Sequence, residues 1–335
     1  MTALVPSRVL VLGSPLLRGG GEGQGEEAKI LPFSELPTLF GPGDVVVVND
    51  AATFPGSVHF QRRGRTLEAR LFEKTARGFA AVLFGPGDFH TRTEHRPPPP
   101  RLAVGERITV AGLSAEIASV DSRSPRLVEL HFDVDDATQW SALYAHGHPI
   151  QYAHQREPLP LWAVQNVYAE RPWAAELPSA GHHLTIGMLA AIERQGAAVA
   201  RLTHATGLSS TGDEALDRTL PWPERYSIPA QTMAAVRGAR RVVAVGTSVL
   251  RALEAHATSG ELEGIATRVI GPETQLRVVH ALLTGIHSPQ ESHYRLLGAL
   301  VDDAILARMI GVAEHEHLRP HEFGDVALVS AWHEA

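Results

Sequence analysis

The residues best suited to chemistry follow an apolar run, Val242–Val245, as Gly246-Thr247-Ser248. A buried strand that turns at such a sequence and continues into a helix leaves the N–H groups of the first helical turn exposed, and the two hydroxyls add donors. Arg251, one turn further on, has the planar guanidinium that binds a carboxylate through two hydrogen bonds. The segment predicts a site for an anionic group. The alternative is that Ser248 caps the helix and Arg251 pairs with an outward-facing acid.

Polar residues also end a second apolar run. Val45 to Val48 is expected to form a buried strand that ends at Asn49 and Asp50, and open α/β sheets bind ligands beyond the carboxyl ends of their strands. The amide and carboxylate can bind sugar hydroxyls or an amine, or the pair can cap a turn. Tyr168 can stack on a base or fill a gap between domains.

Alternating helices and strands must position these residues. Apolar residues recur at helical spacing before a glycine in two places, which predicts helices from Thr185 to Gln195 and from Pro229 to Arg237. Each is followed by an apolar run that predicts a strand, and such alternation is typical of parallel pairing. The remaining elements expected are strands at Ala197–Thr203, Val242–Val245, Val278–Leu283 and Val326–Ser330, a helix at Val249–Thr258 and a long helix from about Gln290 to Met309.

Residues 54–134 have a different pattern. Short β-rich runs alternate there with glycine and proline turns, which predicts a small antiparallel barrel. The expected fold class is therefore an α/β main domain with an inserted small antiparallel β-barrel domain. The main domain is expected to comprise residues 1–53 and 135–335, and the barrel residues 54–134.

The composition of the 335 residues limits the chemistry further. There is no cysteine, which excludes disulfides, thiolate nucleophiles, iron–sulfur clusters and cysteine-ligated zinc. The N-terminal apolar run is too short to cross a bilayer and lacks a signal-peptide pattern, so we expect a cytoplasmic protein. With a formal charge of −7, contact with RNA would need a local basic face. The candidates for that face are Arg62, Arg63, Arg65 and Arg70, although such charges also protect strand edges.

The segment Ala244–Glu254, AVGTSVLRALE, resembles a motif of the S-adenosylmethionine:tRNA ribosyltransferase-isomerase family of queuosine biosynthesis, in the same strand–turn–helix position. Further similarities follow in the family's order along nearly the whole chain. They are Arg8–Val11, Gly43–Asp50, Gln165–Ala169, Pro178–Thr185 (similar to PTAGLHFT), Thr284–Pro289 (similar to TNFHLP) and Phe323–Leu328 (similar to YGDAML). The resemblance implies an α/β domain that carries an inserted β-barrel, which agrees with the pattern of residues 54–134.

The reaction implied by the resemblance transfers and isomerises the ribosyl group of S-adenosylmethionine onto a 7-aminomethyl-7-deazaguanine in tRNA, which forms epoxyqueuosine and releases adenine and methionine. It implies S-adenosylmethionine as a co-substrate, tRNA as a partner, and no permanently bound cofactor or metal. The chemistry requires a base beside the sulfonium, an acid for the departing adenine, and groups that bind a carboxylate and an adenosine. The implied candidates for proton transfer are His183, His204, His287 and Asp325; those for binding are Asn49, Asp50, Tyr168, Gly246, Thr247, Ser248 and Arg251.

The chain departs from the family's pattern inside these motifs. Ala51-Ala52 stands where the family usually has Thr-Arg, and Gly285 replaces the asparagine of TNFH. The LHVGxGTF motif becomes Leu202–Ser209 with loss of its glycines, Gln290–His293 replaces a run of small residues and leucine, and Phe323 replaces a tyrosine. These differences leave two alternatives open: a paralogous S-adenosylmethionine-dependent transferase that acts on a non-tRNA acceptor, or a catalytically inactive nucleoside-binding protein.

Histidine and glutamate residues gather at Glu314–His317, with His321 nearby. Ligands at positions i, i+2 and i+6 beside Pro320 match no standard zinc spacing, and a solvated polar loop explains them equally well. We therefore expect no metal site in this segment or elsewhere.

Overall fold

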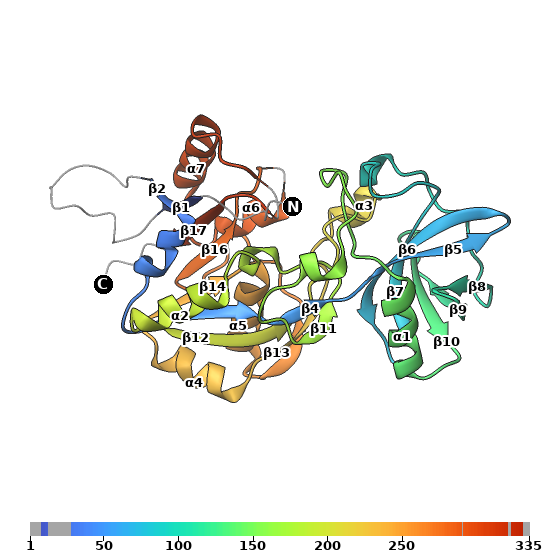
Figure 1. Ribbon diagram of the computed structural model, residues 1–335, viewed down its shortest axis with the longest axis horizontal. Coiled ribbons are helices and arrows are strands. Elements are labelled where there is room, and N and C mark those ends of the chain that lie inside the picture. The colour runs from blue at the N-terminus through green and yellow to red at the C-terminus, as the bar shows by residue number, and fades with distance from the viewer. Residues whose placement is uncertain (1–7, 13–27, 290, 321–322, 331–335) are drawn as a thin grey trace.

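A sheet covered by helices and a β-barrel lie side by side in the computed structural model, which describes residues 8–12, 28–289, 291–320 and 323–330 (Figure 1). The sheet belongs to the N-terminal and C-terminal parts of the chain, and the barrel is formed by the segment between them. This arrangement confirms the predicted fold class, an α/β part with an inserted small antiparallel barrel.

The large sheet has the strand order β15-β13-β12-β3-β14-β16-β17-β1-β2 within the described residues. Its strands are β1 (Arg8–Leu12), β2 (Lys29–Pro32), β3 (Asp44–Asn49), β12 (Ala198–His204), β13 (Glu224–Ser227), β14 (Arg241–Val245), β15 (Glu263–Ala266), β16 (Ala281–Gly285) and β17 (Val326–Ser330). At the centre, β3 pairs in parallel with β12 and β14, as predicted. The sheet is nevertheless mixed, because β16 pairs antiparallel with β17, β12 with β13 and β1 with β2.

Helices cover both faces of this sheet. They are α2 (Ile186–Arg194), α4 (Ala230–Gly238), α5 (Thr247–Ser259), α6 (Ser292–Leu297) and α7 (Asp303–His315), with the short 3-10 helices η2 (Phe33–Leu39) and η5 (Ser179–Gly181). A further 3-10 helix, η4 (Leu161–Val164), lies in the connector after α1. Val45 and Val47 of β3 pack in one apolar cluster with α4, α5 and α7, and Val46 and Val48 pack in another with η2 and α2. Four consecutive valines suit a strand that is buried on both faces. None of the described helices is long and apolar enough to cross a membrane.

The barrel consists of six antiparallel strands in the closed order β10-β7-β6-β5-β8-β9. Its strands are β5 (Ser57–Arg62), β6 (Arg65–Lys74), β7 (Gly78–Phe84), β8 (Arg107–Val110), β9 (Leu113–Val120) and β10 (Leu127–Phe132), with η3 (Thr93–His95) between β7 and β8 and the short helix α3 (Glu214–Asp217) packed nearby. α1 (Asp136–His146) follows the barrel and packs against its core through Trp140 and Leu143. Trp140 lies edge-on to Phe54 and Phe79, with ring centroids 5.7 and 5.4 Å apart.

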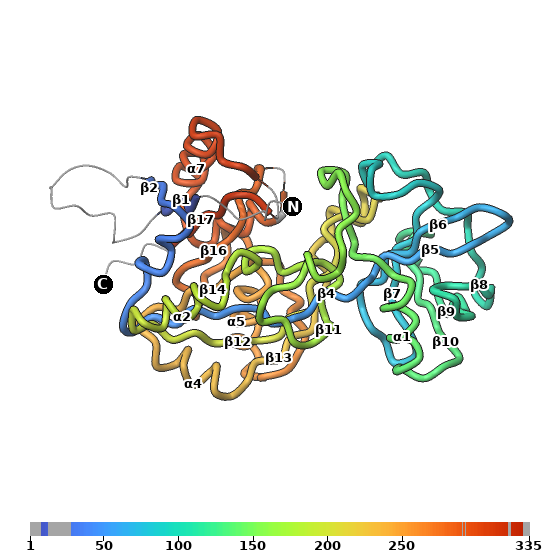
Figure 2. Tube along the Cα trace, viewed as in Figure 1, coloured from blue at the N-terminus to red at the C-terminus, as the bar shows by residue number. Residues whose placement is uncertain are grey.

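Two chain segments connect the barrel with the α/β part. β4 (Ala51–Thr53) leads into the barrel, and β11 (Arg171–Ala174) follows the connector that returns from α1. The two strands pair in parallel, and the trace in Figure 2 places both between the two parts of the molecule. The division of the chain into domains at residues 53/54 and 134/135 stays a prediction.

The helix predicted from about Gln290 to Met309 is wrong, because two helices, α6 and α7, take its place. The chain turns at Gly298, where an added Cβ would lie 2.7 Å from Cγ of Pro272. Asp302 then begins α7, since its carboxylate accepts a hydrogen bond from the backbone N–H of Ile305 at 2.9 Å. α6 follows β16 after the short segment 286–291, in which part of the site described next is formed.

Candidate active site

A cavity of about 1060 Å³ lies between the barrel side of the molecule and the α/β part. Arg92 and Thr93, at the start of η3, line it, together with much of the connector from Ile150 to Leu159, the start of α5 and the chain after β16. Small-molecule sites commonly occupy such junctions, and this volume is at the upper end of their usual range. The predicted site residues on its wall are Gly246, Thr247, Ser248, Arg251 and His287.

The turn between β14 and α5 places hydrogen-bond donors on this wall. Gly246 has a φ of +91°, which glycine adopts without the strain that a side chain would add. Thr247 and Ser248 follow in the first helical turn, whose N–H groups have no acceptor within the helix. The helix start can therefore bind an anionic group.

Asn49 and Asp50 lie behind this wall and do not line the cavity. Nδ2 of Asn49 donates to the carbonyl oxygen of His204 at 2.9 Å and to Oγ of Ser248 at 3.2 Å, and Oδ1 accepts from two backbone N–H groups. One of these, at residue 51, closes an Asx turn. Asp50 accepts a hydrogen bond from Thr203 Oγ1 at 2.6 Å, and burial raises its pKa. The contacts of Asn49 are thus internal and join β3, β12 and α5.

Arg251 binds a carboxylate of the chain itself. Its guanidinium forms an ion pair with Glu224, and Nη2 donates to the carbonyl oxygens of Trp222 and Ala266 at 3.0 and 3.1 Å. Burial raises the pKa of Glu224, although Arg251 and the N–H of Gly207 favour the ionised form. A carboxylate of the chain therefore occupies the position that we expected for a substrate carboxylate, and the acid that pairs with Arg251 is half-buried and lines the cavity instead of facing outward.

His204 lies at the end of β12, next to this ion pair, and is fully buried. Its Nε2 is 3.7 Å from Oε2 of Glu224, and neither ring nitrogen has a hydrogen-bond partner among the described residues. Burial, together with the charge of Arg251, lowers the pKa of His204 to about 3. The imidazole is therefore neutral at neutral pH, and it does not line the cavity.

His287 is the predicted proton carrier that lines the cavity. Its Nε2 lies 3.0 Å from Oγ1 of Thr284 and its Nδ1 lies 2.9 Å from Oε2 of Glu291. The ring stacks on that of His293, with centroids 4.8 Å apart. Burial opposes ionisation of Glu291, but hydrogen bonds from His287 and Ser288 outweigh it and lower the pKa of Glu291 to about 2. An ionised carboxylate thus orients the imidazole, and Nε2 can exchange a proton with a ligand in the cavity when the ligand takes the place of the Thr284 hydroxyl.

Two other predicted proton carriers lie away from the cavity. His183 is buried beside the ring of His182, and burial, His182 and the charge of Arg319 lower its pKa to about 3. Asp325 is fully buried and accepts hydrogen bonds from the backbone N–H groups of Arg8 at 3.0 Å and Arg319 at 2.8 Å. In this structure Asp325 therefore holds the backbone near the start of β1.

Tyr168 also lies outside the cavity wall. Its ring is buried in the apolar cluster that contains η2 and α2, and its hydroxyl donates to the carbonyl oxygen of Gly181 at 3.1 Å. Gly181 must be glycine here, because an added Cβ would lie 1.9 Å from the Tyr168 hydroxyl oxygen. Tyr168 therefore packs within the α/β part and does not fill a gap between domains, and its stacking on a base stays a prediction.

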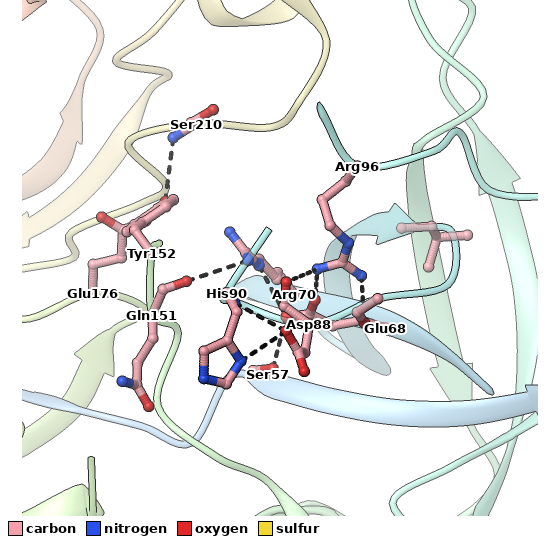
Figure 3. A network of polar contacts seen from close by, with 12 residues as sticks. Ser57, Glu68, Arg70, Asp88, His90, Arg96, Gln151, Tyr152, Glu176 and Ser210 are labelled. Carbon is pink, nitrogen blue, oxygen red and sulfur yellow. Dashed lines mark hydrogen bonds and ion pairs between the residues drawn. The ribbon is translucent and has the colours of Figure 1, made fainter. Parts of the chain in front are cut away.

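A buried ionic network supports the barrel side of the cavity (Figure 3). Glu68 accepts hydrogen bonds from Nε of Arg70 at 3.0 Å and Nη1 of Arg96 at 2.6 Å. Although burial opposes its ionisation, these two arginines lower the pKa of Glu68 to about 2. Arg70 also donates to the carbonyl oxygen of Gln151 at 3.3 Å and lies over the ring of Tyr152. Because Gln151 and Tyr152 line the cavity, the network fixes the position of this wall.

Tyr152 connects the same wall with loops of the α/β part. Its hydroxyl donates a hydrogen bond to Glu176 and accepts one from the backbone N–H of Ser210 at 3.3 Å (Figure 3). Glu176 also accepts from the backbone N–H of Ser209 at 2.9 Å. These contacts tie the connector to the loop after β12.

The predicted basic face is only partly exposed. Arg70 does not belong to it: this prediction is wrong, because Arg70 is fully buried and paired with Glu68. Arg62 forms hydrogen bonds with Glu106 at 2.7 and 3.1 Å. Arg63 and Arg65 remain exposed, in and beside the turn between β5 and β6.

The sequence analysis did not identify several residues that line the cavity. Glu224, Glu291 and His293 line the cavity, as does Glu176. A signal existed for Glu291 and His293, because both lie in the segment that departs from the family's motif after Pro289. No local pattern connects Glu224 with Arg251, which follows it by 27 residues.

Comparison with known proteins matches residues 12–329 to the family described as queuosine biosynthesis protein. A relative from Rubrobacter xylanophilus, named S-adenosylmethionine:tRNA ribosyltransferase-isomerase, is 32% identical over 89% of this chain and 85% of its own length. A relative of the same name from Thiobacillus denitrificans is 34% identical over 89% of this chain and 86% of its own length. A crystal structure of S-adenosylmethionine tRNA ribosyltransferase from Thermotoga maritima aligns over 98% of this chain and 94% of its own, with 21% identity and a TM-score of 0.48.

Proposed function

The chain belongs to the queuosine biosynthesis protein family, and from this membership we propose that it is an S-adenosylmethionine:tRNA ribosyltransferase-isomerase. It transfers and isomerises the ribosyl group of S-adenosylmethionine onto a 7-aminomethyl-7-deazaguanine in tRNA. Adenine and methionine leave, and epoxyqueuosine forms in the tRNA.

One observation of this structure carries the proposal for the site. The start of α5 and His287 line the same cavity between the barrel side and the α/β part. The reaction needs both kinds of group together, since one part of the co-substrate is anionic and another must exchange protons. The cavity also has room for two ligands of modest size, as a transfer between co-substrate and nucleobase requires.

We assign His287 to proton transfer, with Glu291 as the residue that orients it. His287 is the member of the predicted set whose imidazole reaches the cavity, and its two nitrogens are held by Glu291 and Thr284. His183, His204 and Asp325 are proposed to support the site through packing and hydrogen bonds, because all three are buried and none lines the cavity.

We assign binding of the co-substrate's anionic group to the first turn of α5. Gly246, Thr247 and Ser248 supply backbone and hydroxyl donors there. Arg251 contributes positive charge to the same wall while its hydrogen bonds go to Glu224 and two carbonyl oxygens. Asn49 positions Ser248, and Asp50 and Tyr168 support the strand and loop behind it.

The experiment that tests the function measures adenine release from S-adenosylmethionine by the purified full chain. Three parallel reactions contain tRNA with the 7-aminomethyl-7-deazaguanine base, the same tRNA without it, or the free base. Release only with the modified tRNA supports the proposal. Release with the free base alone would identify a transferase for a small acceptor, and binding without release in any reaction would identify a nucleoside-binding protein.

A further inference from the structure

Two imidazoles and a carboxylate converge on the cavity wall after β16. His287 lies in the loop, Glu291 precedes α6, and His293 lies in the first turn of α6. Each offers one ligand atom, and the three atoms lie within 4.8 Å of one another. All three residues line the cavity, so the cluster is accessible to a small ion.

Two of the three residues, His287 and Glu291, are held by hydroxyl groups on the side that faces away from the centre of the cluster. Nε2 of His287 is hydrogen-bonded to Thr284 Oγ1 at 3.0 Å, which leaves Nδ1 toward Glu291. Ser288 Oγ donates to Oε1 of Glu291 at 2.8 Å, which leaves Oε2 toward His287. Residues that bind metals are usually oriented in this way by a hydroxyl, carbonyl or carboxylate behind them.

The spacing also suits a small cation. Ligand atoms bound at about 2.0 Å to one tetrahedral ion lie about 3.3 Å apart, so side-chain movements of about 1 Å would bring the three atoms into that arrangement. Two imidazoles and one carboxylate are a donor set for zinc and other first-row divalent ions, whereas magnesium and calcium prefer oxygen donors. Three protein ligands leave at least one coordination position for a water molecule or a ligand.

We propose that His287, Glu291 and His293 form a binding site for a divalent transition-metal cation of the zinc type on the wall of the cavity. The site goes beyond the proposed function, and it is an alternative to our expectation of no metal, which stays a prediction. A cation on Nδ1 of His287 excludes that imidazole from proton transfer, so the proton-transfer role belongs to the metal-free protein. It lies in the segment after Pro289 where the chain departs from the family's motif. A bound cation would give this wall a point of attachment for an oxygen or carboxylate group of a ligand.

The test measures metal binding directly and does not depend on activity. The full chain is treated with a chelator, desalted and titrated with Co²⁺, whose visible absorption reports its coordination, and the Zn²⁺ affinity follows by displacement of Co²⁺. We expect one Co²⁺ per chain. Glu291→Gln and His293→Ala should weaken binding at least a hundredfold, and Thr284→Val, behind His287, should weaken it about 10-fold to 100-fold.

The matched control is a double variant at the end of α7, His315→Ala with His317→Ala. These histidines belong to the second group of histidines and glutamates, and the side chain of His315 is 85% exposed. The control should bind Co²⁺ as the unmodified chain does. Circular dichroism of each metal-free variant shows whether it is folded. If His293→Ala fails to fold, Glu291→Gln still tests the proposal, because glutamine has nearly the same size and shape as glutamate. Failure of the unmodified chain to bind Co²⁺ or Zn²⁺ would overturn the proposal, as would undiminished binding by folded Glu291→Gln.

Discussion

The side-chain amide of Asn49 donates a hydrogen bond to Oγ of Ser248 at 3.2 Å, which joins the end of β3 to the first turn of α5. The same amide donates to the carbonyl oxygen of His204, so three elements meet at one buried side chain. Asn49 is 1% exposed, and its four polar contacts leave no group for a ligand. Its contribution to the site is to hold Ser248 in position.

Replacement of Asn49 by alanine should therefore destabilise the protein. The substitution leaves buried backbone groups of His204 and the N–H of Ala51 without partners, and we expect a loss of about 2–4 kcal/mol in the free energy of unfolding. Urea denaturation measures it. The control Gln61→Ala removes an exposed amide in the barrel and should cost less than about 0.5 kcal/mol. Equal effects of the two substitutions would refute this role for Asn49.

The ion pair between Glu224 and Arg251 should show strong coupling. Glu224→Gln leaves the Arg251 guanidinium, whose side chain is 4% exposed, without its counter-charge, so we expect a loss of about 3 kcal/mol in stability. Adding Arg251→Met to Glu224→Gln should recover part of this loss, because no unpaired charge remains buried. Denaturation of both single variants and the double variant measures the coupling. Additive losses would contradict the account.

Stability should fall as the pH decreases from about 6.5 toward 3, in part because of His204. Burial and the charge of Arg251 lower its pKa to about 3 in the folded protein, so in this range the unfolded chain binds a proton that the folded chain does not. One such group contributes up to about 1.4 kcal/mol per pH unit, and because the unfolded histidine is half protonated at pH 6.5, the loss between pH 6.5 and 4.5 is about 2.3 kcal/mol. His204→Leu should lose correspondingly less over the same interval, as measured by denaturation at each pH. Parallel pH profiles for the two proteins would exclude this contribution.

Substitution of His287 should affect turnover more than binding. His287→Gln preserves a hydrogen-bonding side chain but cannot carry the transferred proton, so we expect kcat for adenine release to fall about 10²-fold to 10⁴-fold, with a small change in KM. The exposed His59 of the barrel offers a matched control, and His59→Gln should retain full activity. A His287→Gln enzyme with unchanged kcat would move proton transfer to another residue.

Much of the fold could be predicted because its signals are local. Four valines before Asn49 indicate a strand buried on both faces, and glycines end the flanking helices. The break between α6 and α7 was missed although Asp302, a favoured N-cap residue, is a local signal for the start of α7; the contact of Gly298 with Pro272, which is distant in the sequence, could not be predicted. The burial of Arg70 likewise depends on the register of β6 and on Arg96 and Glu68, which share its ionic network.

The same distinction between local and distant signals applies to the residues of the candidate site. The turn at Gly246 was predicted to be a donor-rich helix start, since strand, glycine and hydroxyls are contiguous in the sequence. The partners that determine what Arg251 and His287 can do were not predicted in the same way. Glu224 reaches Arg251 only after β13 and β15 pair beside it, and Glu291 reaches His287 only because the chain turns into α6.

The most direct test of the central claim is the identity of the nucleoside formed in the tRNA. The purified full chain is incubated with S-adenosylmethionine and tRNA that carries 7-aminomethyl-7-deazaguanine, and the digested tRNA is analysed by liquid chromatography and mass spectrometry. The account predicts that the modified nucleoside is converted to epoxyqueuosine, with one adenine and one methionine released for each conversion. An unchanged nucleoside after incubation with folded protein that binds S-adenosylmethionine would contradict it.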